Sequence, residues 1–289
     1  MRALVLSGGG SKGAYQVGVL KKLLVDDGNQ YDLVAGISVG SINASILAQY
    51  PVGKEADAWE RMKASWDRVE TSRIRKGWCI VGAIASLWES SVYNSKPLLE
   101  WILSELNQAK IIGSGRKLRV VSVSWDSGES YVADELDPDI ARWVAASSAF
   151  PVMLSPVEVR GQLWADGGIR SVTPLGEAIR AGATDIDCVL CADPELEAPF
   201  RTKGRAALPA LAVRALELMN NQIMRADLKI CGLKNEIAGP YRKVNVRVFK
   251  PSVDLSVIQD SLAFDPGLIQ RTIALGYEDA WKYPEGQSV

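Results

Sequence analysis

Residues 33–47 read LVAGISVGSINASIL, and this stretch decides how the first part of the chain folds. Its first five residues are an apolar run of strand length, and residues 42–47 continue with the spacing of a helix. Between them, Gly36, Ser38 and Gly40 form the pattern G-x-S-x-G. A serine at such a junction fits a sharp strand-to-helix turn that projects its hydroxyl out of the backbone. The simpler alternative is a serine that caps the helix N-terminus.

A glycine loop occurs earlier in the same kind of context. Residues 2–7 form a short apolar run, the sequence GGGSKG follows, and helical spacing begins at residue 14. The loop contains Gly8, Gly9, Gly10, Lys12 and Gly13. Consecutive glycines leave backbone N–H groups unshielded, and such donors can stabilise an oxyanion when they converge on one point. The loop is therefore a candidate oxyanion hole.

The glycine loop also has a competing interpretation. Gly8, Gly10 and Gly13 match the G-x-G-x-x-G fingerprint of dinucleotide-binding proteins, and Asp32 follows about twenty residues later. However, the ribose-binding acid should end the second strand, whereas Asp32 precedes the second apolar run. A phosphate P-loop requires Gly-Lys-Ser/Thr, which this loop lacks.

The rest of the chain repeats the alternation of strands and helices. This alternation predicts an α/β fold with three layers, in which helices cover both faces of a mostly parallel sheet. Further strands are expected at residues 118–125, 131–133, 186–191 and 244–249, with a hairpin at 156–163. Helices are expected at residues 140–148, 208–230 and 268–283. Residues 54–110 read as a mainly helical insertion within a single domain spanning 1–289.

The helix expected at residues 208–230 carries an apolar stripe. Its members are Leu211, Ala215, Leu218, Met219 and Ile223. Their spacing places them on one helix face, and we expect this face to pack into the core rather than to bind a partner.

Composition excludes several classes of function. The 289 residues carry a net charge of −1, so nothing suggests nucleic-acid binding. The chain contains no histidine, which excludes Ser-His-Asp and Cys-His catalysis and histidine-ligated zinc within it. Cys188 and Cys191 have CxxC spacing, but on a strand they would face opposite sides of the sheet. We expect neither metal nor cofactor.

A third motif becomes a candidate for the catalytic base because the chain contains no histidine. Asp166, Gly167 and Gly168 follow an extended segment, where a simple turn is the ordinary explanation. A serine nucleophile nevertheless needs a base, and only Asp, Glu, Lys and Tyr remain available. The residues alone do not select Asp166 among these.

Together the three motifs resemble the patatin-like phospholipases of bacterial or phage type. That family carries G-G-G-x-[RK]-G, then G-x-S-x-G, then D-G-[GA], in this order, and the resemblance extends over roughly residues 1–280. It implies a Ser-Asp dyad with Ser38 as nucleophile and Asp166 as base. It also implies an oxyanion hole from the backbone of Gly8, Gly9 and Gly10, in which Gly8 shapes the turn.

This chain departs from the family pattern at three positions. Ser7 stands where an acidic residue is frequent, Lys12 where arginine is usual, and Val172 where asparagine often precedes the proline after D-G-G. None of these changes removes a catalytic group. The last would loosen support for the aspartate loop.

The resemblance implies a lipid acyl hydrolase of the phospholipase A1/A2 or lysophospholipase type, acting through an acyl-enzyme on phospholipid or other lipid esters. The alternatives are an acyltransferase on the same dyad and a nucleotide- or phosphate-binding module. We expect a cytoplasmic protein without a transmembrane segment. Residues 78–88, which are apolar and flanked by tryptophans, fit either a membrane-surface lid, with peripheral membrane contact, or a core helix. Lys12 is either solvated or faces a lipid phosphate.

Overall fold

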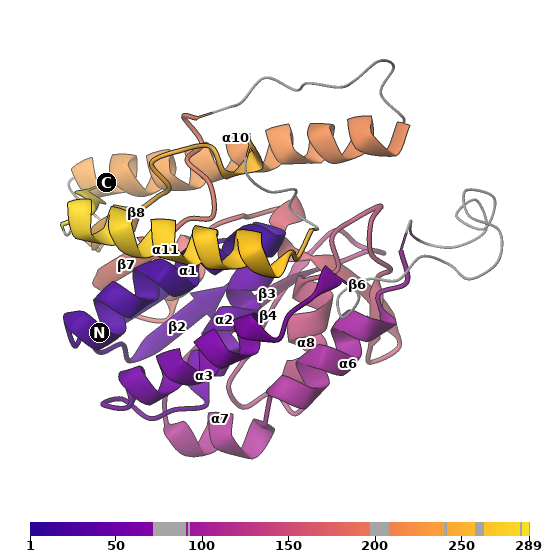
Figure 1. Ribbon diagram of the computed structural model, residues 1–289, viewed down its shortest axis with the longest axis horizontal. Helices are drawn as coiled ribbons and strands as arrows, with labels where there is room; N and C mark the ends of the chain where they lie inside the picture. The colour runs from indigo at the N-terminus through magenta and orange to yellow at the C-terminus, as the bar shows by residue number, and fades with distance from the viewer. Residues whose placement is uncertain are drawn as a thin grey trace.

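A single β-sheet forms the centre of the protein (Figure 1). The computed structural model describes residues 1–71, 91, 93–196, 208–237, 239, 242–257, 263–283 and 285–288. Nine strands are found among them. They are β1 (Arg2–Leu6), β2 (Leu33–Gly36), β3 (Lys117–Ser124), β4 (Ser130–Asp134), β5 (Val157–Val159), β6 (Gln162–Asp166), β7 (Asp185–Val189), β8 (Asn245–Phe249) and β9 (Gln287–Ser288).

The middle of the sheet is parallel and its margins are antiparallel. The strand order is β5-β6-β3-β2-β1-β7-β8-β9, and β4 pairs with β3 off this path. Strands β3, β2, β1, β7 and β8 pair in parallel, while β4, β5, β6 and β9 pair antiparallel. Parallel strands joined by helices need cover on both faces, which explains why β1 is almost continuously apolar.

Helices cover both faces of the sheet and complete three layers. The described helices are α1 (Gly13–Leu20), α2 (Val39–Ala48), α3 (Glu55–Asp67), α6 (Lys96–Glu105), α7 (Gln108–Ser114), α8 (Ile140–Ser147), α9 (Leu175–Arg180), α10 (Leu208–Glu236) and α11 (Pro266–Lys282). One core joins alternate strand residues such as Leu4 and Leu6 to α1, α2, α3, α8 and α11. The other core joins Ala3 and Val5 to α9 and α10. Figure 1 shows α10 on the opposite side of the sheet from α2 and α3.

The predicted fold class is therefore confirmed, and most expected elements lie where the sequence places them. Strand β9 and helices α7 and α9 had no separate prediction. Helices α3 and α6 fall within the expected helical insertion at residues 54–110, and α7 begins at its end and extends beyond it. The tryptophan-flanked segment at residues 78–88 lies outside the described residues. Among those that are described, no helix combines the length and hydropathy needed to cross a bilayer.

The expected orientation of α10 is wrong for four of the five stripe residues, since among them Ile223 alone packs against the core. Three residues that the apolar stripe assigns to the core are exposed: Leu211 by 47%, Leu218 by 41% and Met219 by 58%. Residues on another face of the helix pack inward, among them Met224 and Cys231. A stripe predicts burial only where the neighbouring surface is apolar, and α10 faces a pocket along part of its length.

Two strand ends meet beside the middle of β3. Strand β2 runs alongside the first half of β3 and ends with Gly36 opposite Val120. Strand β6 approaches along the second half of β3 from the other direction and ends with Asp166 opposite Ser122. Both strands lie on the same side of β3, because β4 occupies the other side. Their ends therefore converge beside Val121, the β3 residue between Val120 and Ser122.

Candidate active site

Ser38 lies on a strained turn between β2 and α2. Its φ and ψ are 55° and −130°, a conformation that is uncommon for any residue other than glycine. The turn is possible because Gly36 and Gly40 touch neighbouring backbone: a Cβ on Gly36 would lie 2.2 Å from the carbonyl oxygen of Gly40. The Ser38 side chain makes no capping hydrogen bond with α2. The helix-cap interpretation of this serine is therefore wrong.

Asp166 ends β6 and is buried in the protein interior. Only 2% of the residue is exposed, and its Oδ1 accepts a 2.8 Å hydrogen bond from the backbone N–H of Gly168. Its other oxygen, Oδ2, has no hydrogen bond of ordinary geometry among the described residues. A buried, incompletely bonded carboxylate costs folding free energy, so its presence calls for a functional explanation.

Burial raises the pKa of Asp166 to about 7, although the N–H of Gly168 and the nearby Ser38 hydroxyl both act to lower it. Desolvation dominates because it disfavours the charged carboxylate. A carboxyl group with a pKa near neutrality is a much stronger base than an ordinary aspartate. It can accept a proton from a hydroxyl group in a reaction at neutral pH.

The glycine loop lies beside these two residues. Gly8 donates its N–H to the carbonyl of Val172 at 3.1 Å, so this donor is already occupied. Among the described residues, the N–H groups of Gly9 and Gly10 have no acceptor. Gly9 packs so tightly on Cys191 that a Cβ would lie 2.2 Å from the Cβ of that cysteine. The loop thus offers two free N–H donors, while Gly8 holds the turn in place.

Ser147 joins the elements that meet at this point. Its hydroxyl donates to the carbonyl of Val121 at 2.6 Å and accepts the backbone N–H of Ser38 at 3.0 Å. Val121 is the β3 residue between the ends of β2 and β6. Nothing in the sequence motifs indicated this bridge.

One pocket connects all of these groups. Its lining includes Ser38, Asp166 and Gly168 together with Gly8, Gly9, Gly10 and Lys12, and its cavity volume is about 130 Å³. The structure therefore gathers the three motifs around one cavity, although the Asp166 motif lies more than a hundred residues after the other two. Gly13, Gly36, Gly40 and Gly167 do not line it; they support the surrounding turns.

Lys12 is buried rather than solvated. Only 8% of the residue is exposed, and it lines the pocket without an acceptor for its ammonium group among the described residues. This placement removes the solvated-lysine alternative. It leaves a cation next to the glycine loop, where negative charge on a ligand would be favoured.

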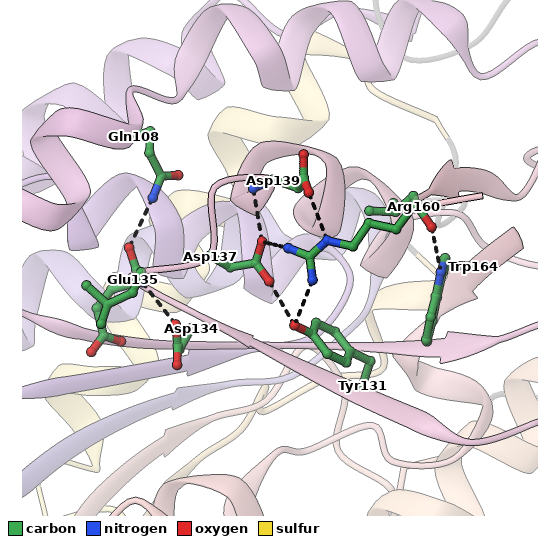
Figure 2. A network of polar contacts seen from close by, with 10 residues as sticks. Gln108, Tyr131, Asp134, Glu135, Asp137, Asp139, Arg160 and Trp164 are labelled. Atoms are coloured by element: carbon green, nitrogen blue, oxygen red, sulfur yellow. Dashed lines mark hydrogen bonds and ion pairs between the residues drawn. The ribbon is translucent and has the colours of Figure 1, made fainter. Parts of the chain in front are cut away.

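The hairpin that carries Asp166 is anchored at its other end by a polar network, drawn in Figure 2. Arg160, at the tip between β5 and β6, binds Asp137 at 2.6 Å and Asp139 at 3.0 Å. The hydroxyl of Tyr131 donates to Asp137 at 2.8 Å, and the Arg160 guanidinium lies 5.7 Å from the ring centre of Trp143. These contacts tie the tip to β4 and α8 and so fix the direction of β6.

Asp227 on α10 supports the loop after Asp166, and the sequence gave no signal for it. It accepts hydrogen bonds from the Ser171 hydroxyl at 3.1 Å and from the Thr173 backbone N–H at 3.3 Å. Burial raises the pKa of Asp227, and these donors partly oppose that effect. The loop is thus held from α10 at the place where Val172 replaces the family's asparagine.

Two alternatives based on single motifs do not match the geometry. Asp32 binds the N–H of Arg2 at 3.0 Å, at the start of β2 and therefore at the opposite end of the sheet from the glycine loop. It cannot reach a ribose held at that loop. Cys188 and Cys191 belong to the cores on opposite faces of the sheet, as their spacing predicts.

Comparison with known proteins gives consistent results. A family profile described as patatin-like phospholipase matches residues 4–179. Relatives include the uncharacterized protein YjjU of Escherichia coli, which is 28% identical over 63% of this chain and 49% of its own length. Patatin-like phospholipase domain-containing protein 6 of Mus musculus is 29% identical over 64% of this chain and 13% of its own. Lysophospholipase NTE1 of Debaryomyces hansenii is 27% identical over 64% of this chain and 11% of its own length.

The chain spans half or less of the length of these relatives. Among solved structures, VipD from Legionella pneumophila aligns over 100% of this chain and 68% of its own length. The sequence identity is 15% and the TM-score is 0.49. The family match ends at residue 179, short of the residue 280 that the motif resemblance suggested. It covers the Ser38 turn, the glycine loop and the Asp166 turn, and this chain belongs to the patatin-like phospholipase family.

Proposed function

We propose that this protein is a lipid acyl hydrolase of the phospholipase A or lysophospholipase type, which cleaves carboxylic esters with Ser38 and Asp166. The observation that carries the proposal is the shared pocket. The serine on its strained turn, the buried carboxyl group with a raised pKa and the two glycines with free backbone donors all line one cavity. The family membership and the name of the relative lysophospholipase NTE1 support a lipid ester as the substrate.

The first half of the reaction forms an acyl-enzyme. The Ser38 oxygen bonds to the ester carbonyl carbon as its proton passes to Asp166, and the carbonyl electrons move onto the oxygen. The N–H groups of Gly9 and Gly10 and the N-terminus of α2 stabilise this oxyanion. Collapse of the intermediate breaks the carbon–oxygen bond to the alcohol, which takes the proton from Asp166.

The second half releases the fatty acid. Water attacks the acyl-enzyme and gives a proton to Asp166, and the Ser38 oxygen leaves and recovers that proton. A single carboxyl group thus acts as base and then as acid in each half. A pKa near 7 suits both roles, because neither protonation state is strongly disfavoured.

The test is product analysis by mass spectrometry after incubation with mixed phospholipids and lysophospholipids. We expect free fatty acid from the wild type and a loss of about 10⁴-fold or more in Ser38→Ala and in Asp166→Ala. Circular dichroism checks that both variants fold, and a fluorophosphonate should label the wild type but not Ser38→Ala. Near-normal turnover by Asp166→Ala would rule out the dyad. Acyl transfer to an added alcohol in place of fatty acid release would indicate an acyltransferase.

A further inference from the structure

Helix α10 turns a polar face toward the pocket. Arg214, Glu217, Asn220 and Asn221 all line it, and Met224 follows one turn later. Spacings of three and four residues place these side chains on one helix face. These four residues, 214, 217, 220 and 221, form the polar row of α10. It explains why the apolar stripe of α10 is not the face that packs inward.

The opposite wall of the pocket has a different chemistry. It is built mainly from large apolar side chains supplied by α3, α6 and neighbouring segments: Trp66, Val69, Leu98, Trp101, Phe150 and Phe264. Ser38 and Asp166 lie in the same cavity as both walls. An ester of a fatty acid has an apolar acyl side and a polar alcohol side, so the two walls match the two sides of such a substrate.

Asn220 and Asn221 are available to a ligand. Both are half-buried, and neither makes a hydrogen bond within the described part of the chain. Asn220 Nδ2 lies 3.8 Å from the position that a Cβ on Gly168 would occupy, which places this carboxamide beside the Asp166 turn. Carboxamides offer both donors and acceptors, so they can bind glycerol hydroxyl and ester oxygens next to the reacting atoms.

Arg214 and Glu217 add a pair of opposite charges farther along the row. Arg214 Nη1 lies 3.8 Å from Glu217 Oε2, and their side chains are exposed by only 17% and 27%. A guanidinium suits a phosphate, and a carboxylate suits an ammonium group. A headgroup that carries both charges fits this pair, whereas a purely anionic headgroup meets the Glu217 carboxylate unfavourably.

We propose that the polar row is the headgroup subsite and that it selects zwitterionic glycerophospholipids, with the acyl chain on the apolar wall. In this arrangement Arg214 faces the phosphate, Glu217 faces the amine, and the two asparagines bind the glycerol portion. The inference rests on the proposed ester hydrolysis by Ser38, but it concerns residues that the reaction itself does not need.

The activity test compares four substrates: lysophosphatidylcholine, lysophosphatidylglycerol and monoacylglycerol with one acyl chain, and p-nitrophenyl butyrate, which has no headgroup. In Asn220→Ala/Asn221→Ala we expect kcat/KM for lysophosphatidylcholine to fall about tenfold further than for p-nitrophenyl butyrate, mainly through KM. In Glu217→Gln the preference for lysophosphatidylcholine over lysophosphatidylglycerol should shrink about fivefold. Gln222→Ala, on the exposed face of α10, is the matched control and should keep the wild-type ratios.

A binding test separates this inference from the catalytic proposal. The Ser38→Ala protein is titrated with an ether analogue of lysophosphatidylcholine, which cannot be hydrolysed, and the same is done after adding the two asparagine substitutions. Loss of about tenfold in affinity supports the subsite even if no hydrolysis is found. Equal losses on all four substrates, or unchanged affinity for the ether lipid, would overturn it.

Discussion

At the residue scale, the decisive property is the charge state of Asp166. The carboxyl group is buried, the N–H of Gly168 and the Ser38 hydroxyl act to lower its pKa, and no cation in the described part of the chain contributes to that pKa. Its pKa of about 7 therefore comes from desolvation, and the protonated form persists to neutral pH. The base in the proposed mechanism is the deprotonated form, so activity depends on the fraction that has lost its proton.

The first prediction concerns pH. We expect kcat/KM for p-nitrophenyl butyrate to rise about tenfold per pH unit below the Asp166 pKa and to level off above a midpoint near 7. The sign follows because lower pH protonates the base. Rates measured across about pH 5 to 9, with circular dichroism at each pH to exclude unfolding, provide the check. A profile that is flat through this range would contradict Asp166 as the base.

At the element scale, the site depends on two strand ends held together by a helix residue. The ends of β2 and β6 converge beside Val121, and Ser147 of α8 bonds both to Val121 and to Ser38. Ser147 is fully buried, so water cannot replace its hydroxyl group easily. The position of the Ser38 turn relative to Asp166 therefore depends on where α8 packs.

The second prediction is that Ser147→Ala lowers kcat/KM by about tenfold to a hundredfold, because small displacements of reacting groups are costly. It should also destabilise the fold by about 1–3 kcal/mol, since the Ser38 N–H is left buried without an acceptor. Ester hydrolysis and urea unfolding measure the two effects. Ser45→Ala is the matched control, because Ser45 is buried on α2 and its hydroxyl has no partner there among the described residues. Equal activity of the two variants would argue against the bridge.

At the scale of the whole molecule, a buried ion pair lies at the opposite end of the sheet from the candidate site. Ser38, the glycine loop and Asp166 follow strand ends on one side. At the other end, just before β3, Arg116 is fully buried and pairs with Glu55 of α3 at 2.9 Å. Its guanidinium also donates to the carbonyls of Tyr31 and Tyr50. This residue joins α3 to the segments that enter β2 and leave α2.

The third prediction is that Glu55→Ala destabilises the protein by about 3–5 kcal/mol, because it leaves the Arg116 charge buried without its partner. Urea unfolding gives the free energy. Activity per folded molecule, counted by fluorophosphonate labelling, should stay close to the wild type, since neither member of the ion pair lines the pocket. Asp57→Ala removes an exposed pair with Lys54 and should change stability by no more than about 0.5 kcal/mol. Similar unfolding of both variants would refute the role of the buried pair.

The sequence by itself determined the fold class, the Ser38 turn and the glycine loop, because these depend on local patterns of apolar residues and glycines. It also excluded histidine chemistry. It did not by itself determine why Asp166 rather than another acid lies at the site, and the resemblance to a family supplied that choice. The physical reason is that β6 reaches Ser38 by pairing with β3, a contact made between segments about forty residues apart.

Only the tertiary structure decided the surroundings of the Ser38 turn. Helical spacing assigned the apolar stripe of α10 to the core. Which face of a helix is turned inward depends, however, on the surface that the helix packs against. Here the polar row lines a pocket, and the opposite face of α10 is exposed. Likewise, the raised pKa of Asp166 arises from desolvation by segments distant in the chain, and the bridge through Ser147 requires α8 to pack against β3. Local sequence set Ser38 in its turn; long-range packing set the pKa of Asp166 and the chemistry of the pocket walls.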